Sequence, residues 1–225
     1  KMSGAREVDR QTDEGRQLYS TVEKLSRYAD LKTPRVYIIE DQNMNAFATG
    51  RNESHAAVAV TTGLLQVLDQ AELEGVIAHE LAHIGNKDIL ISSVVAVLVG
   101  LIVHMVHISA FNRSEDGKGN ALIGILAMII APLAATIIQL AVSRSREFQA
   151  DATAALITNN PQGLVSALQK IHSHNVHQPL ESASNATAHM YISNPFGGGE
   201  GEEGPGVLAK LFMTHPPVGE RVAKL

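Results

Sequence analysis

The sequence of 225 residues contains no cysteine. Disulfides, thiolate zinc sites and cysteine nucleophiles are therefore excluded, and any metal ion has to be bound by His, Asp or Glu. The sequence also lacks a dense run of Lys and Arg, and its formal net charge is −5, which argues against a nucleic-acid partner. Neither the G-x-S-x-G motif of serine hydrolases nor a phosphate-binding glycine loop is present.

The chain begins with Lys rather than Met and carries no signal-peptide pattern. We therefore expect a fragment or a processed chain, from which any N-terminal membrane segment is missing. Charge is also absent from two long apolar runs, at 89–108 and 121–142. Each run matches the roughly 20 residues that a helix needs to cross a bilayer. Together they predict a transmembrane hairpin over 89–142, and the alternative is a hairpin buried in the core of a soluble protein.

Short stretches rich in β-branched residues predict a small sheet formed by 34–41, 46–50 and 56–62. Apolar residues recur at helical spacing among charges in 4–31, which predicts an exposed amphipathic helix. Further helices are expected at 143–158, at 161–175 and, after an ordered turn, near the end of 211–225. The expected fold class is α+β. One domain comprises 1–88 and 143–225, with the hairpin of 89–142 inserted into it.

The stretch HELAH at 79–83 carries the clearest chemical signal in the sequence. Asp69 and Glu72 have the spacing of a capping box and precede apolar residues at helical spacing, so HELAH is expected on a helix. His79 and His83 then share one face and can bind one zinc ion. Glu80 lies about 100° around the helix from His79 and is suited to act as a base on a water molecule. The alternative is a pair of core histidines on an apolar helix.

A catalytic zinc site needs a third protein ligand, and Glu147 is the best candidate. It lies five residues after the second apolar run, whereas His83 lies six residues before the first. A hairpin that crosses the membrane twice returns the chain to the same side, so it brings these two residues to one surface. Asp151 lies one turn further along the same helix face and can accept a hydrogen bond from a ligand histidine. The alternative for Glu147 is a solvated charge among neighbouring arginines.

The predicted strand at 46–49 is a candidate for substrate binding. It comprises Ala46, Phe47, Ala48 and Thr49. An extended peptide can add to the edge of a sheet through its backbone hydrogen bonds. We therefore expect these four residues to contact the backbone of a polypeptide substrate.

Several motifs together resemble the HtpX branch of the Ste24/CAAX-type membrane zinc metalloproteases. These are HELAH, the two apolar runs, SRSREFQADATAA (143–155), THPP (214–217), NAFATG (45–50) and AVAVTTGLL (57–65). The resemblance implies a thermolysin-like zincin domain with one Zn²⁺ per chain, bound by His79, His83 and Glu147. It further implies that Asn45 and His215 line the cleft and stabilise the oxyanion of the reaction.

The resemblance also implies a cellular role. Such enzymes are bacterial inner-membrane proteins with the active site facing the cytoplasm, and they hydrolyse misfolded or damaged membrane proteins under stress. The expected partners are polypeptide substrates and the lipid bilayer, while the oligomeric state stays open. Two alternatives also stay open: a peptidase specific for prenylated C-termini, and a catalytically silent membrane scaffold with a structural metal.

Overall fold

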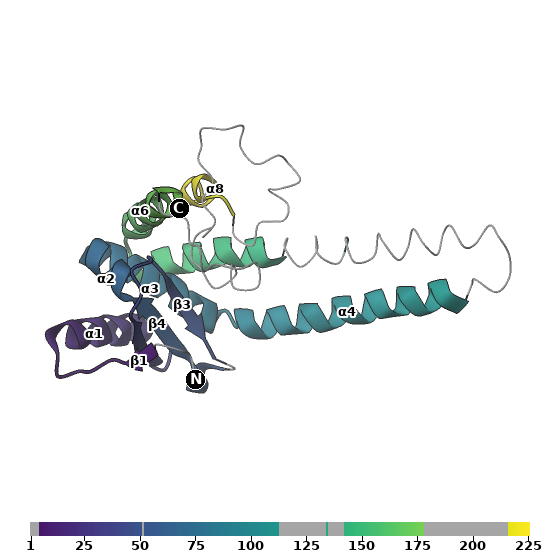
Figure 1. Cartoon of the computed structure of the whole chain (residues 1–225), viewed down its shortest axis with the longest axis horizontal. Helices are drawn as coiled ribbons and strands as arrows, with labels where there is room; N and C mark the ends of the chain where they lie inside the picture. The colour runs from purple at the N-terminus through teal and green to yellow at the C-terminus, as the bar shows by residue number, and fades with distance from the viewer. Residues whose placement is uncertain (1–4, 51, 113–133, 135–141, 178–215) are drawn as a thin grey trace.

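The computed structural model describes residues 5–50, 52–112, 134, 142–177 and 216–225. A four-stranded sheet lies beside a group of helices, and helix α4 (Asp88–Asn112) extends away from them as one long element (Figure 1). The α+β class predicted from the sequence is confirmed. The hydrophobic core lies between the sheet and the helices that cover it.

The sheet has the strand order β1–β2–β4–β3. Its strands are β1 (Ala5–Glu7), β2 (Arg35–Ile39), β3 (Ala46–Thr49) and β4 (Ala57–Thr61). β2 and β4 are parallel and central, whereas β1 and β3 are antiparallel to their neighbours and form the two edges. The three predicted strands are confirmed, each slightly shorter than its predicted range. All five residues of β4 are buried, as expected for a central strand.

The prediction of one helix over 4–31 is wrong at its beginning. Residues Ala5–Glu7 pair with Tyr37–Ile39 of β2, and helix α1 spans only Asp13–Tyr28. The Thr12 side chain accepts a hydrogen bond from the backbone nitrogen of Gly15 and so caps the helix. β1 forms because it can pair with β2, which lies some thirty residues later in the sequence. Helical spacing within the segment itself carries no information about such a partner.

Helix α3 (Gln70–Gly85) carries HELAH, as predicted. Its capping box is present, because Asp69 accepts from the backbone nitrogen of Glu72 while the Glu72 side chain accepts from the backbone nitrogen of Asp69. The apolar residues that recur at helical spacing are buried in the core: Leu73, Val76, Ile77, Leu81 and Ile84. Burial of this face fixes the rotation of α3 and thereby the direction in which its histidines point.

Helix α3 crosses α6 (Pro161–His177) at very short range because each helix has a glycine at the contact. A Cβ atom on Gly75 would lie 2.6 Å from the backbone nitrogen of Leu164. One on Gly163 would lie 2.5 Å from the carbonyl oxygen of Ala71. Any side chain at either position would therefore force the two helices apart.

Two other predicted helices are confirmed. Residues 142–158 are helical, and the short helix α8 (Val218–Val222) lies near the C-terminus beside α6 (Figure 1). One short helix, α2 (Thr62–Val67), follows β4 directly and was not predicted. Its Thr61 side chain accepts from the backbone nitrogen of Leu64 and caps it.

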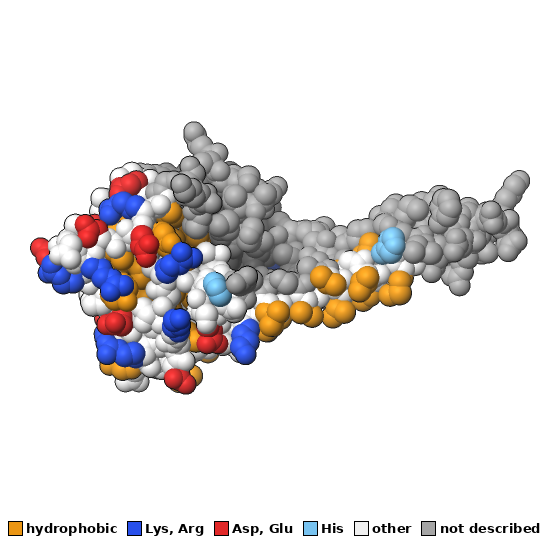
Figure 2. Space-filling model, turned by 90° about the horizontal axis from the view of Figure 1, so that it is seen from below, with side chains coloured by type: hydrophobic (Ala, Val, Ile, Leu, Met, Phe, Trp, Pro, Cys, Tyr) orange, Lys and Arg blue, Asp and Glu red, His pale blue; other side chains and the backbone are white. Residues whose placement is uncertain are grey.

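Helix α4 exposes a row of large apolar side chains along one face (Figure 2). This apolar stripe consists of Leu90, Ile91, Val94, Val97, Leu98, Leu101, Ile102 and Met105. None of the helices in the described part of the chain has the length and apolar character needed to traverse a bilayer. The structure therefore does not support the predicted crossing at 89–108. The second run, 121–142, lies outside the described residues except for 134 and 142.

The Glu72 carboxylate joins the start of α3 to α6. Besides its part in the capping box, it accepts hydrogen bonds from Ser166 Oγ at 2.6 Å and from Lys170 Nζ at 2.8 Å. Burial alone would raise the pKa of Glu72, but these donors and the Asp69 backbone outweigh it and lower that pKa. The carboxylate is therefore charged and fully engaged at neutral pH.

We predict that Glu72→Ala lowers the free energy of unfolding by about 2–3 kcal/mol, because a helix cap and two further hydrogen bonds are lost. Urea denaturation in detergent measures the change. The matched control is Glu23→Ala, which removes only an exposed ion pair with Arg27 at 3.7 Å and should change stability by less than about 0.5 kcal/mol. Equal effects of the two substitutions would contradict the role given to Glu72.

Candidate metal centre

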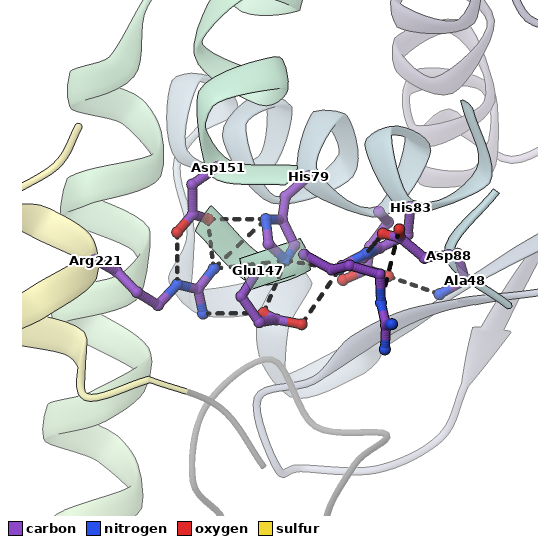
Figure 3. Close-up of polar contacts among 9 residues, drawn as sticks. Ala48, His79, His83, Asp88, Glu147, Asp151 and Arg221 are labelled. Atoms are coloured by element: carbon purple, nitrogen blue, oxygen red, sulfur yellow. Dashed lines mark hydrogen bonds and ion pairs between the residues drawn. The ribbon is translucent and has the colours of Figure 1, made fainter. Parts of the chain in front are cut away.

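Four helices contribute polar side chains to one buried cluster (Figure 3). Helix α3 supplies His79, Glu80 and His83, and the helix at 142–158 supplies Glu147 and Asp151. The first residue of α4, Asp88, and Arg221 of α8 complete it. Except for His83, whose side chain is one-fifth exposed, these residues are buried.

The three predicted metal ligands lie together. Nε2 of His79 and Nε2 of His83 are 3.1 Å apart, and each lies 3.6 Å from an oxygen of Glu147. One ligand atom from each residue can be chosen so that all three lie within 4.8 Å of one another. The helix at 142–158 thus returns the chain to α3, as the position of Glu147 in the sequence suggested.

These three residues fit a zinc ion by type and by spacing. Imidazole nitrogen and carboxylate oxygen are ordinary zinc ligands, with bonds of about 2.0–2.2 Å. Tetrahedral coordination at that length places ligand atoms roughly 3.4 Å apart. The separations of 3.1 and 3.6 Å are close to that value. The cluster can therefore hold one such ion with little rearrangement of its side chains.

Each histidine is oriented by a carboxylate from a different helix. His79 Nδ1 lies 2.9 Å from Asp151 Oδ1, and His83 Nδ1 lies 2.6 Å from Asp88 Oδ2. An Nδ1–H that donates to a carboxylate leaves the lone pair on Nε2, which is the nitrogen that faces Glu147 in both residues. Asp151 occupies the position predicted for it. Asp88 was missed, although an acidic residue five positions after His83 was a usable signal.

Arg221 is the other residue that the sequence did not reveal. Its side chain is 1% exposed. Nη2 and Nε donate to Asp151 Oδ1 and Oδ2 at 2.6 and 2.8 Å, a two-point contact between guanidinium and carboxylate. Nη1 lies 3.9 Å from a Glu147 oxygen. The available signal was indirect: a buried Asp151 needs a cationic partner, and Arg221 closely follows the THPP motif.

These contacts set the charges of the cluster. Burial would raise the pKa of Asp151, but hydrogen bonds from Arg221 and His79 outweigh it and lower the value to about 2. Burial would lower the pKa of His79, but hydrogen bonds to Asp151 and Glu147 raise it to about 9. Without a metal ion, His79 is therefore protonated at neutral pH. Its positive charge offsets part of the negative charge of Asp151 and Glu147.

Glu80 is buried beside the ligands and lies against the edge strand β3. Its Oε2 accepts a hydrogen bond from the backbone nitrogen of Ala48 at 2.7 Å. Burial, together with the charge of Glu147, raises the pKa of Glu80, although His79, His83 and the Ala48 N–H act in the opposite direction. A carboxylate with a raised pKa is suited to accept and return a proton near neutral pH.

Of the remaining predicted site residues, Asn45 and Ala46–Thr49 are described by the structure and His215 is not. Asn45 is buried immediately before β3, and its backbone exchanges hydrogen bonds with Thr61. Ala46–Thr49 form β3 and pair with β4 on one side only. The same strand contacts α3 through Ala48 and Glu80. His215 lies outside the described residues.

We predict that Asp88→Asn weakens zinc binding by about 10- to 100-fold, because His83 loses the charged partner that orients it. Competition with a chromophoric chelator measures the dissociation constant, and circular dichroism checks that the helices persist. The control is Glu40→Gln, an exposed carboxylate paired with Arg6. Zinc affinity unchanged in Asp88→Asn would show that the contact between Asp88 and His83 is only structural.

Comparison with known proteins relates the chain to a family of peptidases. The profile of peptidase family M48 matches residues 12–225. A protease HtpX homolog from Campylobacter curvus is 46% identical, and one from Methylibium petroleiphilum is 48% identical; each alignment covers 100% of this chain and 78% of the relative. A protease HtpX homolog from Pyrococcus furiosus is 47% identical over 95% of this chain and 73% of its own length.

The fold also resembles a solved structure. The crystal structure of S. mikatae Ste24p matches with a TM-score of 0.64 and 19% sequence identity, covering 92% of this chain. This chain spans about half of Ste24p, since 49% of that protein is covered. At that identity the likeness concerns the fold, whereas the sequence relationships extend over the whole of the chain. The chain belongs to peptidase family M48.

Proposed function

We propose that this protein is a zinc-dependent endopeptidase of the thermolysin-like zincin type that hydrolyses peptide bonds in misfolded or damaged membrane proteins. The observation that carries the proposal is the convergence of His79, His83 and Glu147 beside the buried carboxylate of Glu80. Three protein ligands are typical of a catalytic zinc site, because they leave one coordination position for water or substrate. Membership of peptidase family M48 supports the same chemistry.

Each residue has a defined task in this reaction. A bound zinc ion supplies Lewis acidity, which polarises the scissile carbonyl and lowers the pKa of water. Glu80 removes a proton from the attacking water and later returns it to the leaving amine. Asp151 and Asp88 keep the two histidines in position. By resemblance to the family, Asn45 and His215 donate hydrogen bonds to the developing oxyanion.

The outer edge of β3 is the proposed binding site for the substrate backbone. Asn45 bonds to Thr61 of β4, and backbone groups alternate in direction along a strand, so those of Ala46 and Ala48 face away from β4. The Ala48 N–H already holds Glu80 at that edge. A peptide that extends along β3 therefore passes directly beside the base.

We predict that Glu80→Gln retains one zinc per chain and loses at least about 10²-fold in kcat, because the amide cannot accept the proton. Metal analysis and casein cleavage in detergent, with and without a chelator, measure both properties. Glu74→Gln is the matched control, since Glu74 lies on the same helix and pairs with Lys24 away from the cluster. Full activity of Glu80→Gln would contradict the mechanism.

The same assay separates the two alternatives that the sequence left open. A peptidase specific for prenylated C-termini would require a lipid on the substrate, so cleavage of casein would exclude that requirement. A silent scaffold would bind zinc through four protein ligands and would show no turnover that depends on Glu80.

We further propose that the protein acts at a bacterial inner membrane, with its site facing the cytoplasm and the apolar stripe of α4 against lipid. Burying the eight large apolar side chains exposed on this helix would be favourable, because each Å² of apolar surface left in water costs roughly 25 cal/mol of free energy. The stripe begins at Leu90, seven residues after the ligand His83. Contact with a bilayer would therefore place the metal centre near the membrane surface.

The absence of native cysteine provides a direct test of the membrane proposal. A fluorophore sensitive to polarity is attached to Leu98→Cys in the stripe, or to Leu156→Cys, which is 83% exposed on another helix. We predict that lipid vesicles shift the emission to the blue and block an aqueous quencher only at position 98. The same response at both positions, or none at position 98, would contradict contact between α4 and lipid.

A further inference from the structure

A pocket of about 430 Å³ adjoins the metal centre at His83, which lines it. Ile84 and Ala56, both buried, form apolar parts of its lining. Thr49, at the end of β3, and Leu90, at the start of the apolar stripe, line it as well. The pocket thus adjoins a metal ligand, the end of the edge strand and the beginning of α4.

Its position relates it to a peptide bound along β3. The Ala48 N–H marks the point where the strand passes the base, because it donates to Glu80. Thr49 is the next residue of β3 and lines the pocket. Side chains of an extended peptide project at intervals of about 3.3 Å along the strand. A side chain within two or three residues of the reacting bond therefore reaches the pocket.

The apolar part of the lining favours a large apolar side chain. Ala56, Ile84 and Leu90 offer no hydrogen-bonding side chain, so a polar group placed against them would lose its hydration. Thr49, Asn52 and Ser54 form a polar part of the same lining. The lining includes one cation, Lys87, and one anion, Glu53, so their formal charges cancel. The volume lies within the range of about 300–1,000 Å³ found for ligand sites, so a bulky group fits. A charged or small side chain gains little from such a pocket.

We propose that this pocket binds a large aliphatic or aromatic side chain of the substrate within three residues of the scissile bond, and that Leu90 sets its size. The proposal rests on the endopeptidase function proposed above and specifies its substrates: polypeptides cut within three residues of a bulky apolar side chain. Leu90 belongs both to the pocket and to the apolar stripe of α4.

The experiment compares Leu90→Ala and Leu90→Trp with Leu98→Ala and Leu98→Trp. Both leucines lie on the exposed stripe of α4 and are similarly exposed, at 57% and 55%, but only Leu90 lines the pocket. Each enzyme is given peptides in which Gly, Ala, Leu, Phe or Trp occupies one of the three positions on either side of the cleaved bond. The readout is kcat/KM for each peptide, in detergent.

At one position, we expect wild type to prefer Leu or Phe over Gly by about tenfold or more. Leu90→Trp should move that preference toward Ala, and Leu90→Ala should extend it to Trp, whereas both Leu98 variants should keep the wild-type order. A side-chain preference that is the same in the Leu90 and Leu98 variants would overturn the proposed role of the pocket. That role would also be overturned if the Leu90 substitutions changed kcat/KM only when lipid is added, whatever the peptide.

A binding measurement separates this proposal from the peptidase mechanism. Fluorescently labelled peptides of the same series are titrated with Glu80→Gln, alone and combined with each Leu90 variant. Dissociation constants should follow the same order of side chains as kcat/KM. If Glu80→Gln cuts as fast as wild type, the mechanism is wrong, while the binding series still tests whether the pocket binds the substrate side chain. Dissociation constants that change neither with the peptide side chain nor with Leu90 would overturn the role of the pocket and leave the mechanism standing.

Discussion

The buried ion pair between Asp151 and Arg221 is the interaction on which the arrangement of the metal centre depends. It joins the helix at 142–158 to α8, and Asp151 also contacts His79 of α3. A buried charge without its partner costs several kcal/mol, so the three helices stabilise one another's positions. Glu147 lies one turn before Asp151 on the same helix. Fixing Asp151 therefore also fixes the third candidate ligand against the two histidines.

A second contact between a histidine and a carboxylate, His83 with Asp88, connects the centre to α4. His83 is oriented by Asp88, the first residue of the helix whose apolar stripe begins two residues later. One turn before His79, α3 packs closely on α6 through Gly75 and Gly163, which leaves α3 little freedom to rotate. A rigid α3, and a helix α4 that begins at Asp88 beside the candidate ligand His83, bring the centre, the pocket and the stripe close together. The proposed substrate selection, membrane attachment and hydrolysis would thus share one small region of the fold.

Features that depend on residues close together in the sequence could be predicted, whereas most features that depend on distant segments could not. The α3 helix, its capping box and the pairing of His79 with His83 are local patterns, and so are the three β-branched strands. Glu147 was predicted from a hairpin expected to cross the membrane twice; the structure places Glu147 beside both histidines, whereas that crossing stays a prediction. β1 and Arg221 were missed because their roles arise only when segments far apart in the chain meet. Asp88 was missed although it lies only five residues after its partner His83. The roles of Asn45 and His215, and the membrane crossing at 121–142, stay predictions.

The central claim is that His79, His83 and Glu147 bind one zinc ion and leave a coordination position for chemistry. X-ray absorption at the zinc edge, combined with anomalous diffraction from crystals of the zinc-loaded protein, tests it most directly. The account predicts one zinc per chain, with Nε2 of both histidines and a Glu147 oxygen at about 2.0–2.2 Å and a fourth ligand that is not from the protein. A fourth protein ligand, or zinc bound away from HELAH, would contradict it.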